Sequence, residues 1–163
     1  MSEISELLER FRRGPELLAV ATTGASNPEL DYVPGPGEWS ARQIACHLAD
    51  AEVVGTDRMR RTIAEDNPAV VWFDEQAWAE HLDYNRRKIS NVLETFRLLR
   101  HDNHDLLKSL PESAYSRTCL HSKDGTVTLL DLLRTYAEHA EGHARQIMET
   151  RRKYKASRVT NTA

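Results

Sequence analysis

The stretch "TLLDLLRTYAEHAEGHARQI", residues 128–147, combines a helical pattern of apolar residues with two histidines four positions apart. Its apolar residues recur every three to four positions, which places them on one face of an α-helix. Thr128 is a good N-cap, so the stretch predicts a long amphipathic helix that runs to about Lys153. The inner face of this helix would carry Leu129, Leu132, Leu133, Tyr136, Ala140, His143 and Ile147.

Three other segments show the same helical spacing of apolar residues and predict three more helices. They cover residues 4–22, 41–65 and 84–110. We expect a kink or break at Gly14 and Pro15, because proline removes a backbone hydrogen bond and clashes with the preceding turn. Ser40 is a suitable N-cap for the second segment, and Pro111 ends the third.

The connections between these helices are long and contain turn-forming residues. Residues 25–39 are rich in proline and glycine and predict a loop. Residues 66–82 contain the sequence "FDEQAW", where a short helix would fit. Residues 115–129 alternate weakly around Asp124-Gly125, which predicts a small hairpin, with an irregular loop as the alternative.

Four amphipathic helices with almost no strand predict an all-α four-helix bundle, which forms a single domain over residues 1–163. The chain is 40% hydrophobic and 29% charged, as expected of a soluble globular protein. A net charge of −3 argues against nucleic-acid binding, and no apolar run is long enough to span a membrane. The basic run 151–155 would end the last helix and complement its dipole. The two cysteines form no disulfide framework and no signal peptide precedes the first helix, which indicates a cytoplasmic protein.

Three histidines lie on the inner faces of two predicted helices. Residues four apart on a helix are about 6 Å apart, so the imidazoles of His139 and His143 can reach one ion. His47 shares a stripe with Ile44 and Ala51 on the helix 41–65. Buried imidazoles need partners, which are either hydrogen bonds within the core or, if the two helices are neighbours, one divalent ion.

The chemistry of the donors narrows the type of metal site. Three imidazoles leave a tetrahedral ion one open position, as in catalytic sites, and they suit Zn²⁺, Ni²⁺, Cu²⁺ or Fe²⁺. Glu141 follows His139 by two positions and therefore points about 200° away from the metal face, so it is not the general base found in zincins. Cys46 is expected in the core, and His101 and His104 are expected in solvent.

The stretch "GEWSARQIACHLADAE", residues 37–52, together with residues 128–147, resembles the DinB/YfiT-like superfamily of bacterial four-helix bundle metalloproteins. The matching features are Trp-Ser before a helix that bears His-Leu, and His-x-x-x-His followed by Gln on a later helix. The resemblance implies a metal bound by His47, His139 and His143, with water completing the shell. Zinc or nickel is the expected ion, and iron is the alternative.

The same resemblance implies an activity. Known members include enzymes that use bacillithiol, mycothiol or glutathione, as S-transferases or as maleylpyruvate isomerases, and many others are described only as metal-dependent hydrolases. We therefore expect a metal-dependent thiol S-transferase or related hydrolase that acts on a small thiol and an electrophilic substrate, and that forms a homodimer. The alternatives are a non-catalytic metal-binding or stress-related interaction protein, and a plain bundle that binds no metal. The sequence identifies no catalytic residue.

Several other side chains are candidates for lining the site. Arg58 lies three turns along the face of His47 and would bind an anionic thiol or substrate, while Gln146 lies almost one turn past His143. Asp50 and Glu52 would orient His47. For each of these four polar residues the alternative is a surface or interhelical pair. Aromatic residues of the connections would either wall a pocket or cap the core, and they are Trp39, Trp72, Phe73 and Trp78.

Overall fold

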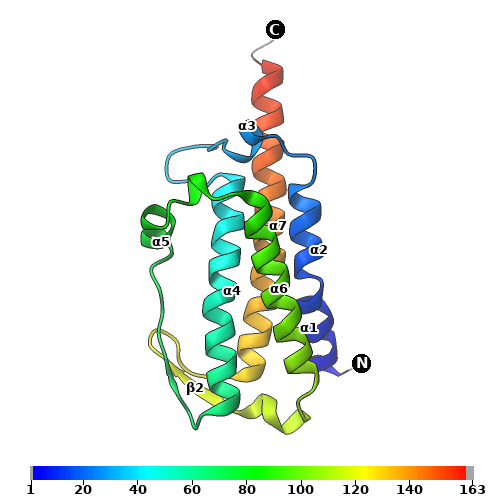
Figure 1. Cartoon of the computed structure of the whole chain (residues 1–163), viewed down its shortest axis with the longest axis vertical. Coiled ribbons are helices and arrows are strands. Elements are labelled where there is room, and N and C mark those ends of the chain that lie inside the picture. Colours follow the sequence, from blue (N-terminus) through cyan, green and yellow to red (C-terminus); the bar gives the residue numbers. More distant parts are fainter. Residues whose placement is uncertain (1, 161–163) are drawn as a thin grey trace.

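The computed structural model describes residues 2–160 as a bundle of four helical columns (Figure 1). The first column consists of two consecutive helices, and each of the other columns is one long helix. Their bounds are α1 Glu3–Arg12 and α2 Gly14–Thr22, α4 Ala41–Ala64, α6 Ile89–Lys108, and α7 Leu129–Thr160. The predicted four-helix bundle is confirmed, and α4 and α7 are direct neighbours.

The helix ends follow from local sequence. Arg13 separates α1 from α2, and Pro15 lies in the first turn of α2, where its missing N–H costs no hydrogen bond. The Ser40 hydroxyl accepts a bond from the Gln43 amide at 3.2 Å, and the Gln43 side chain accepts one from the Ser40 amide at 2.9 Å. This capping box starts α4 at the predicted position. Thr128 caps α7 in the same way, since its hydroxyl accepts the amide hydrogen three residues on at 3.1 Å.

The connections contain short helices and a small sheet. The predicted hairpin is confirmed, and its turn includes Gly125 at a φ of 76°, which favours glycine. A short strand from the connection after α4 pairs in parallel with the hairpin and completes a three-stranded sheet of order β1-β2-β3, which was not predicted. The short elements are α3 Asn27–Leu30, α5 Glu75–His81, η1 Tyr84–Arg86, η2 Glu112–Ser116, β1 Ala69–Val70, β2 Thr118–His121 and β3 Gly125–Thr128.

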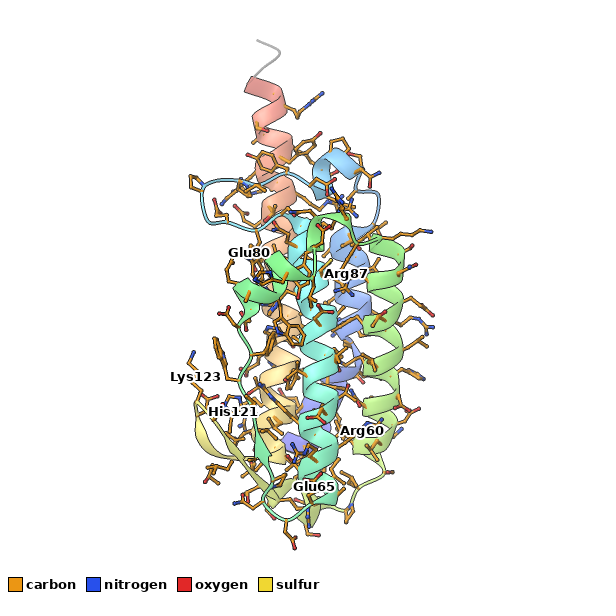
Figure 2. All side chains as sticks on the ribbon, turned by 60° about the vertical axis from the view of Figure 1, so that its left-hand side comes forward. Arg60, Glu65, Glu80, Arg87, His121 and Lys123 are labelled. Atoms are coloured by element: carbon orange, nitrogen blue, oxygen red, sulfur yellow. The ribbon has the colours of Figure 1, made fainter. Side chains whose placement is uncertain are left out.

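The connection between α4 and α6 runs along the outside of α4 and carries α5 (Figures 1 and 2). Figure 2 shows α5, marked by Glu80, on the same side of the bundle as the hairpin, marked by His121 and Lys123. This side of α4 is also the side on which α7 packs its histidines. Within residues 2–160, no helix has both the length and the apolar character needed to cross a bilayer.

Two predicted helix boundaries are wrong. The third long helix begins at Ile89, because Tyr84–Arg86 form a separate 3₁₀ turn. The last helix continues to Thr160, so the basic run 151–155 lies inside it rather than at its end. The reason is pairing with distant acids: Arg151 binds Glu29 at 2.7 Å, and Lys153 binds Glu38 at 2.8 Å.

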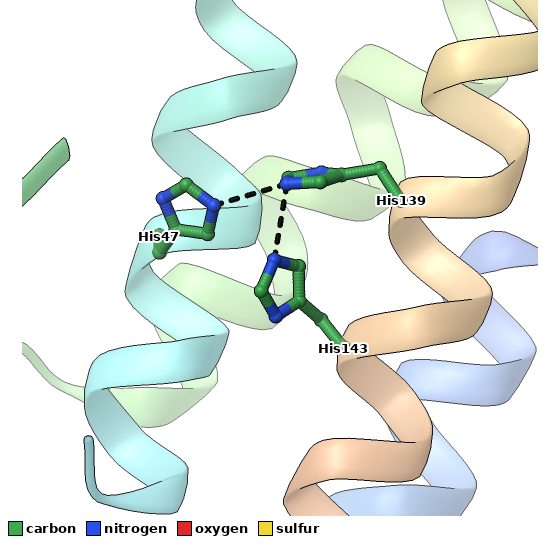
Figure 3. Close-up of side chains that lie close together, drawn as sticks. All are labelled: His47, His139 and His143. Atoms are coloured by element: carbon green, nitrogen blue, oxygen red, sulfur yellow. Dashed lines mark hydrogen bonds between the residues drawn. The ribbon is translucent and has the colours of Figure 1, made fainter. Parts of the chain in front are cut away.

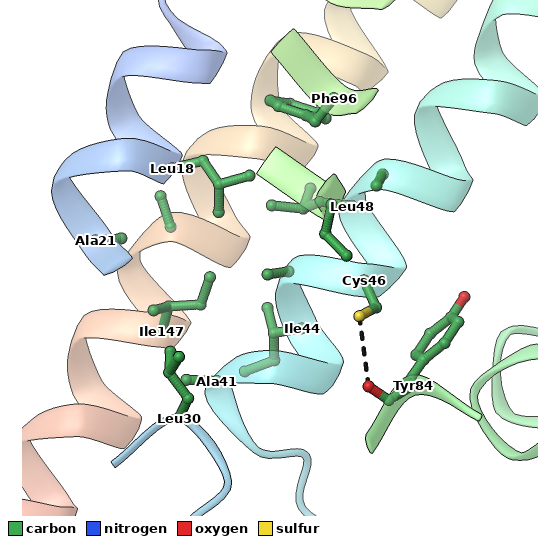
Figure 4. Close-up of a cluster of buried hydrophobic side chains, with 14 of the residues drawn as sticks. Leu18, Ala21, Leu30, Ala41, Ile44, Cys46, Leu48, Tyr84, Phe96 and Ile147 are labelled. Carbon is green, nitrogen blue, oxygen red and sulfur yellow. Dashed lines mark hydrogen bonds between the residues drawn. The ribbon is translucent and has the colours of Figure 1, made fainter. Parts of the chain in front are cut away.

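The core consists of two apolar clusters, one toward each end of the bundle. Figure 4 shows the cluster around Ile44, Leu48, Phe96 and Ile147, all almost fully buried. Each such side chain stabilises the fold by about 1.5–3 kcal/mol. Cys46 belongs to this cluster, as predicted, and its thiol donates to the Tyr84 carbonyl at 3.6 Å. Burial raises the pKa of Cys46 to about 11, so the thiol stays protonated.

Candidate metal centre

Three histidines from α4 and α7 converge on one point (Figure 3). His47 Nε2 lies 3.0 Å from His139 Nε2, which lies 3.1 Å from His143 Nε2. The three rings offer one nitrogen each, and these atoms all lie within 4.8 Å of one another. The structure therefore brings together the three residues that the sequence predicted as ligands.

The spacing of these nitrogens fits a metal ion. A tetrahedral ion with bonds of about 2.0–2.1 Å holds its ligand atoms about 3.3–3.4 Å apart, so small movements of the rings would seat one. His47 comes from the second turn of α4 and is fully buried, whereas His139 and His143 are half-buried and one turn apart on α7. Both helices are long and packed on each other, so the backbone holds the three rings in position.

Burial keeps the three imidazoles neutral. It lowers the pKa of His47 to about 4 and that of His139 to about 3, with a further contribution from the neighbouring rings. Burial also lowers the pKa of His143, although Gln146 and Glu75 act in the opposite direction. At neutral pH each ring therefore has a free lone pair, which is the form that coordinates a cation.

One of the rings also has an outer partner. His143 Nδ1 lies 2.7 Å from Gln146 Oε1, and a proton on Nδ1 leaves the Nε2 lone pair directed at the other two histidines. Such partners fix the tautomer and ring orientation of a metal ligand. His47 Nδ1 is buried and has no hydrogen-bond partner among residues 2–160. Its ring is held by aromatic packing instead.

Aromatic side chains flank His47. The Trp39 ring centroid lies 5.1 Å from the His47 ring, and Phe73 stacks on the same ring at 6.4 Å. Trp78 packs on Phe73 at 4.7 Å. Of the four candidate aromatic residues, these three border the site, while Trp72 is 43% exposed and packs against a lysine of the hairpin.

Tyr136 lies between Arg58 and the histidines. Its guanidinium donates to the Tyr136 hydroxyl at 3.2 Å and to the Val71 carbonyl at 2.6 Å. The Tyr136 ring in turn lies 6.5 Å from that of His139. Arg58 therefore reaches the site through Tyr136, and no contact with the three histidines is present.

The carboxylates of Asp50, Glu52 and Glu141 are paired elsewhere and do not orient the histidines. The structure pairs each with an arginine: Asp50 with Arg87 at 2.7 Å, Glu52 with Arg100 at 2.6 Å, and Glu141 with Arg10 at 2.9 Å. The alternative of an interhelical pair thus holds for Glu52, whose partner lies in α6, while Asp50 pairs with a residue of the connection before α6. Glu141 points away from the site as its spacing predicted.

His101 and His104 were both predicted to lie in solvent, and the structure exposes only one of the two. His101 is exposed as expected, with 69% of its side chain accessible. The prediction for His104 is wrong, because this residue is buried and packs where α6 meets the first helical column. A helical stretch that is polar by composition still turns one residue in three or four inward.

Sequence reasoning missed Glu75. This first residue of α5 places its Oε2 atom 4.0 Å from His47 Nε2. No periodicity links α5 to the long helices, so only the fold brings Glu75 to the site.

Gly142, next to His143, has open space on its side-chain face: a Cβ there would meet no atom within 4 Å.

A family model described as the DinB superfamily matches residues 10–147. The chain belongs to the DinB superfamily. A "putative metal-dependent hydrolase" of Oceanobacillus iheyensis is 31% identical over 144 residues, covering 88% of this chain and 83% of that protein. YfiT of Bacillus subtilis, a "putative metal-dependent hydrolase" by name, is 29% identical over 140 residues, covering 85% and 79%.

Two solved structures are similar in fold. YfiT from Bacillus subtilis, described as a four-helix bundle of unusual topology, has a TM-score of 0.88 at 26% identity and covers 95% of this chain and 90% of its own. A mycothiol-dependent maleylpyruvate isomerase has a TM-score of 0.68 at 17% identity, covering 90% of this chain and 61% of its own. The second likeness shows a shared fold only.

Proposed function

We propose that this protein is a metal-dependent enzyme that activates a nucleophile at a divalent cation held by His47, His139 and His143. The observation that carries the proposal is the convergence of three neutral imidazoles on one point. Three nitrogen donors suit zinc or nickel, with iron as the alternative, and they leave a position open for a substrate. The names of the relatives as metal-dependent hydrolases support the same class of chemistry.

The nucleophile that we propose is a small thiol, which is transferred to an electrophilic substrate; water in a related hydrolysis is the alternative. The bound cation would lower the pKa of the thiol or water that occupies the open position. The resemblance to a superfamily with thiol-dependent members supports the thiol, and the names of the relatives as metal-dependent hydrolases support water.

The chain's own residues have separate tasks in this proposal. Gln146 holds the His143 ring so that Nε2 faces inward. Trp39 and Phe73 cover the His47 ring and exclude water from that side. Arg58 offers a positive charge that would bind a carboxylate of the thiol or of its acceptor beside the Tyr136 hydroxyl.

Elemental analysis followed by turnover measurements tests this function. We expect about one zinc or nickel ion per chain, and metal-dependent turnover of a thiol such as bacillithiol, mycothiol or glutathione with monochlorobimane or a chlorinated aromatic acceptor. His139→Ala should remove both the metal and the activity. Turnover that persists in that variant would contradict the proposal. Metal binding without turnover of any thiol or ester would instead indicate a non-catalytic metal-binding protein.

The assembly and location are also proposals. The family resemblance suggests a homodimer, which sedimentation of the purified protein would test. Both cysteines are free and buried, as expected of a reduced, cytoplasmic protein.

A further inference from the structure

We propose that Glu75 belongs to the metal centre, where its carboxylate faces the open position of the cation and hydrogen-bonds the molecule bound there. The inference rests on the proposed metal-dependent function and adds a residue to it. Glu75 Oε2 lies 4.0 Å from His47 Nε2, one of the three nitrogens that face the common point. No other carboxylate oxygen among residues 2–160 lies within 4.0 Å of a ring nitrogen of these three histidines.

The distance assigns Glu75 to an outer position. A carboxylate bound directly to zinc lies at about 2.0–2.2 Å from the ion, and ligand atoms around one ion are about 3.3–3.4 Å apart. The separation from His47 Nε2 is longer, so a water or thiol at the open position can lie between the carboxylate and the ion. The carboxylate oxygen then accepts the hydrogen bond of that molecule.

The charge of Glu75 is free to act on the site. The other acids near the histidines in sequence each form an ion pair with an arginine, and they are Asp50, Glu52, Glu138 and Glu141. Glu75 pairs with no lysine or arginine among residues 2–160, and half of its side chain, 48%, is exposed. Its charge also reaches His143, whose pKa burial lowers and Glu75 raises.

The fold holds Glu75 in this position through its neighbours. Phe73 stacks on the His47 ring at 6.4 Å, two residues before Glu75. Gln76 accepts a hydrogen bond from Trp39 Nε1 at 3.2 Å, one residue after it. Asp74 caps the N-terminus of α5. Glu75 is thus flanked by two contacts to residues that themselves border His47, which limits how far its backbone can move.

The Glu75 carboxylate should strengthen the binding of the cation. Three neutral rings leave the full double charge of the cation uncompensated, and a nearby carboxylate reduces it. Loss of an outer partner of this kind lowers metal affinity about 10- to 100-fold in known metal sites. Because Glu75 is half exposed, solvent screens its charge and we expect the lower end of that range.

The test compares Glu75→Gln with Glu80→Gln by chelator competition for Zn²⁺. Both variants remove one carboxylate from α5 without changing side-chain size, and the Glu80 side chain accepts a hydrogen bond from Gln76 that a glutamine can still accept. We expect the Zn²⁺ dissociation constant to rise about 10-fold in Glu75→Gln and to stay unchanged in Glu80→Gln. The visible spectrum of the Co²⁺-loaded protein should change only in Glu75→Gln.

The outcomes separate the two proposals. If wild-type protein binds one cation and Glu75→Gln matches it in both Zn²⁺ affinity and Co²⁺ spectrum, the role of Glu75 is wrong while the proposed function stands. Equal loss of affinity in both variants would also contradict the inference, because it would reflect the net charge alone. If wild-type protein binds no metal, both proposals fail. Circular dichroism of each variant confirms that the bundle is intact.

Discussion

The Nε2 atoms of His47 and His139 lie 3.0 Å apart although 92 positions separate them in the chain. Because only the folded bundle brings these rings together, a cation that binds them stabilises the folded state. We expect Zn²⁺ at about 100 times its dissociation constant to add about 2.7 kcal/mol, seen as a rise in melting temperature. His47→Gln should abolish this rise.

The matched control for this prediction is His101→Gln. His101 is exposed on α6 and does not belong to the cluster of three histidines, so its loss removes a histidine without removing a member of the site. The measurement is the difference in melting temperature with and without Zn²⁺, which cancels any destabilisation caused by the substitution itself. A shift of equal size in His47→Gln and wild-type protein would contradict the metal centre.

The convergence of the three histidines was predictable because the position of each depends on local geometry. His139 and His143 are one turn apart on any helix, and His47 shares a stripe with residues that must face the core. The adjacency of α4 and α7 was the single assumption beyond the sequence. The helix pattern, the capping at Ser40 and the hairpin at Gly125 were predictable for the same reason.

The remaining features depend on contacts between distant segments. Tyr84 continues a helical spacing of apolar residues, yet it is buried in a separate turn that packs on α4. The last helix extends past Lys153 because this residue and its neighbours pair with acids from the first third of the chain. Glu75 comes to the site because Phe73 and Gln76 dock α5 against it. No short-range pattern encodes such contacts.

The metal-free protein should lose stability as the pH falls from 7 to 5. The pKa of an unfolded histidine is near 6.5, whereas burial holds that of His47 at about 4 and that of His139 at about 3 in the folded state. Between these values the unfolded chain binds more protons than the folded one, so stability is greatest above pH 6.5 and decreases below it. We expect a loss on the order of 2 kcal/mol from each of these two histidines.

Urea unfolding in the presence of a chelator measures this dependence. The double variant His47→Gln/His139→Gln removes the two groups responsible and should show a clearly smaller loss between pH 7 and 5. An identical pH dependence in the variant would assign the effect to other titrating groups and contradict the prediction. Added Zn²⁺ should oppose the loss in wild-type protein, because the cation competes with protons for the same nitrogens.

Two helical glycines should respond in opposite ways to alanine. A Cβ at Gly55 would lie 2.5 Å from atoms of the Tyr136 ring, whereas a Cβ at Gly142 would meet nothing within 4 Å. We expect Gly55→Ala to cost about 1–3 kcal/mol because the buried ring must move. Gly142→Ala should stabilise α7 by up to about 1 kcal/mol, since alanine favours helix.

Unfolding in urea compares these two variants directly. Gly55→Ala should also weaken the contact between Tyr136 and Arg58, so we expect a higher KM for an anionic thiol in this variant and an unchanged KM in Gly142→Ala. If Gly55→Ala is as stable as wild-type protein, the close packing of Tyr136 on α4 is not what fixes this ring beside His139.

Removing one charge of the buried ion pair between Arg100 and Glu52 should destabilise the fold more than removing both charges. Arg100 is 1% exposed, lies between the rings of Phe11 and Phe96, and donates to Glu52 at 2.6 Å. Arg100→Met leaves the Glu52 carboxylate buried without its cation, which costs about 3–5 kcal/mol. Adding Glu52→Gln removes that charge and keeps an acceptor for Asn103, so the double variant should be more stable than Arg100→Met alone. Urea unfolding of both variants measures this difference. A double variant less stable than the single one would show that the destabilisation by Arg100→Met arises from lost packing of the guanidinium on the aromatic rings.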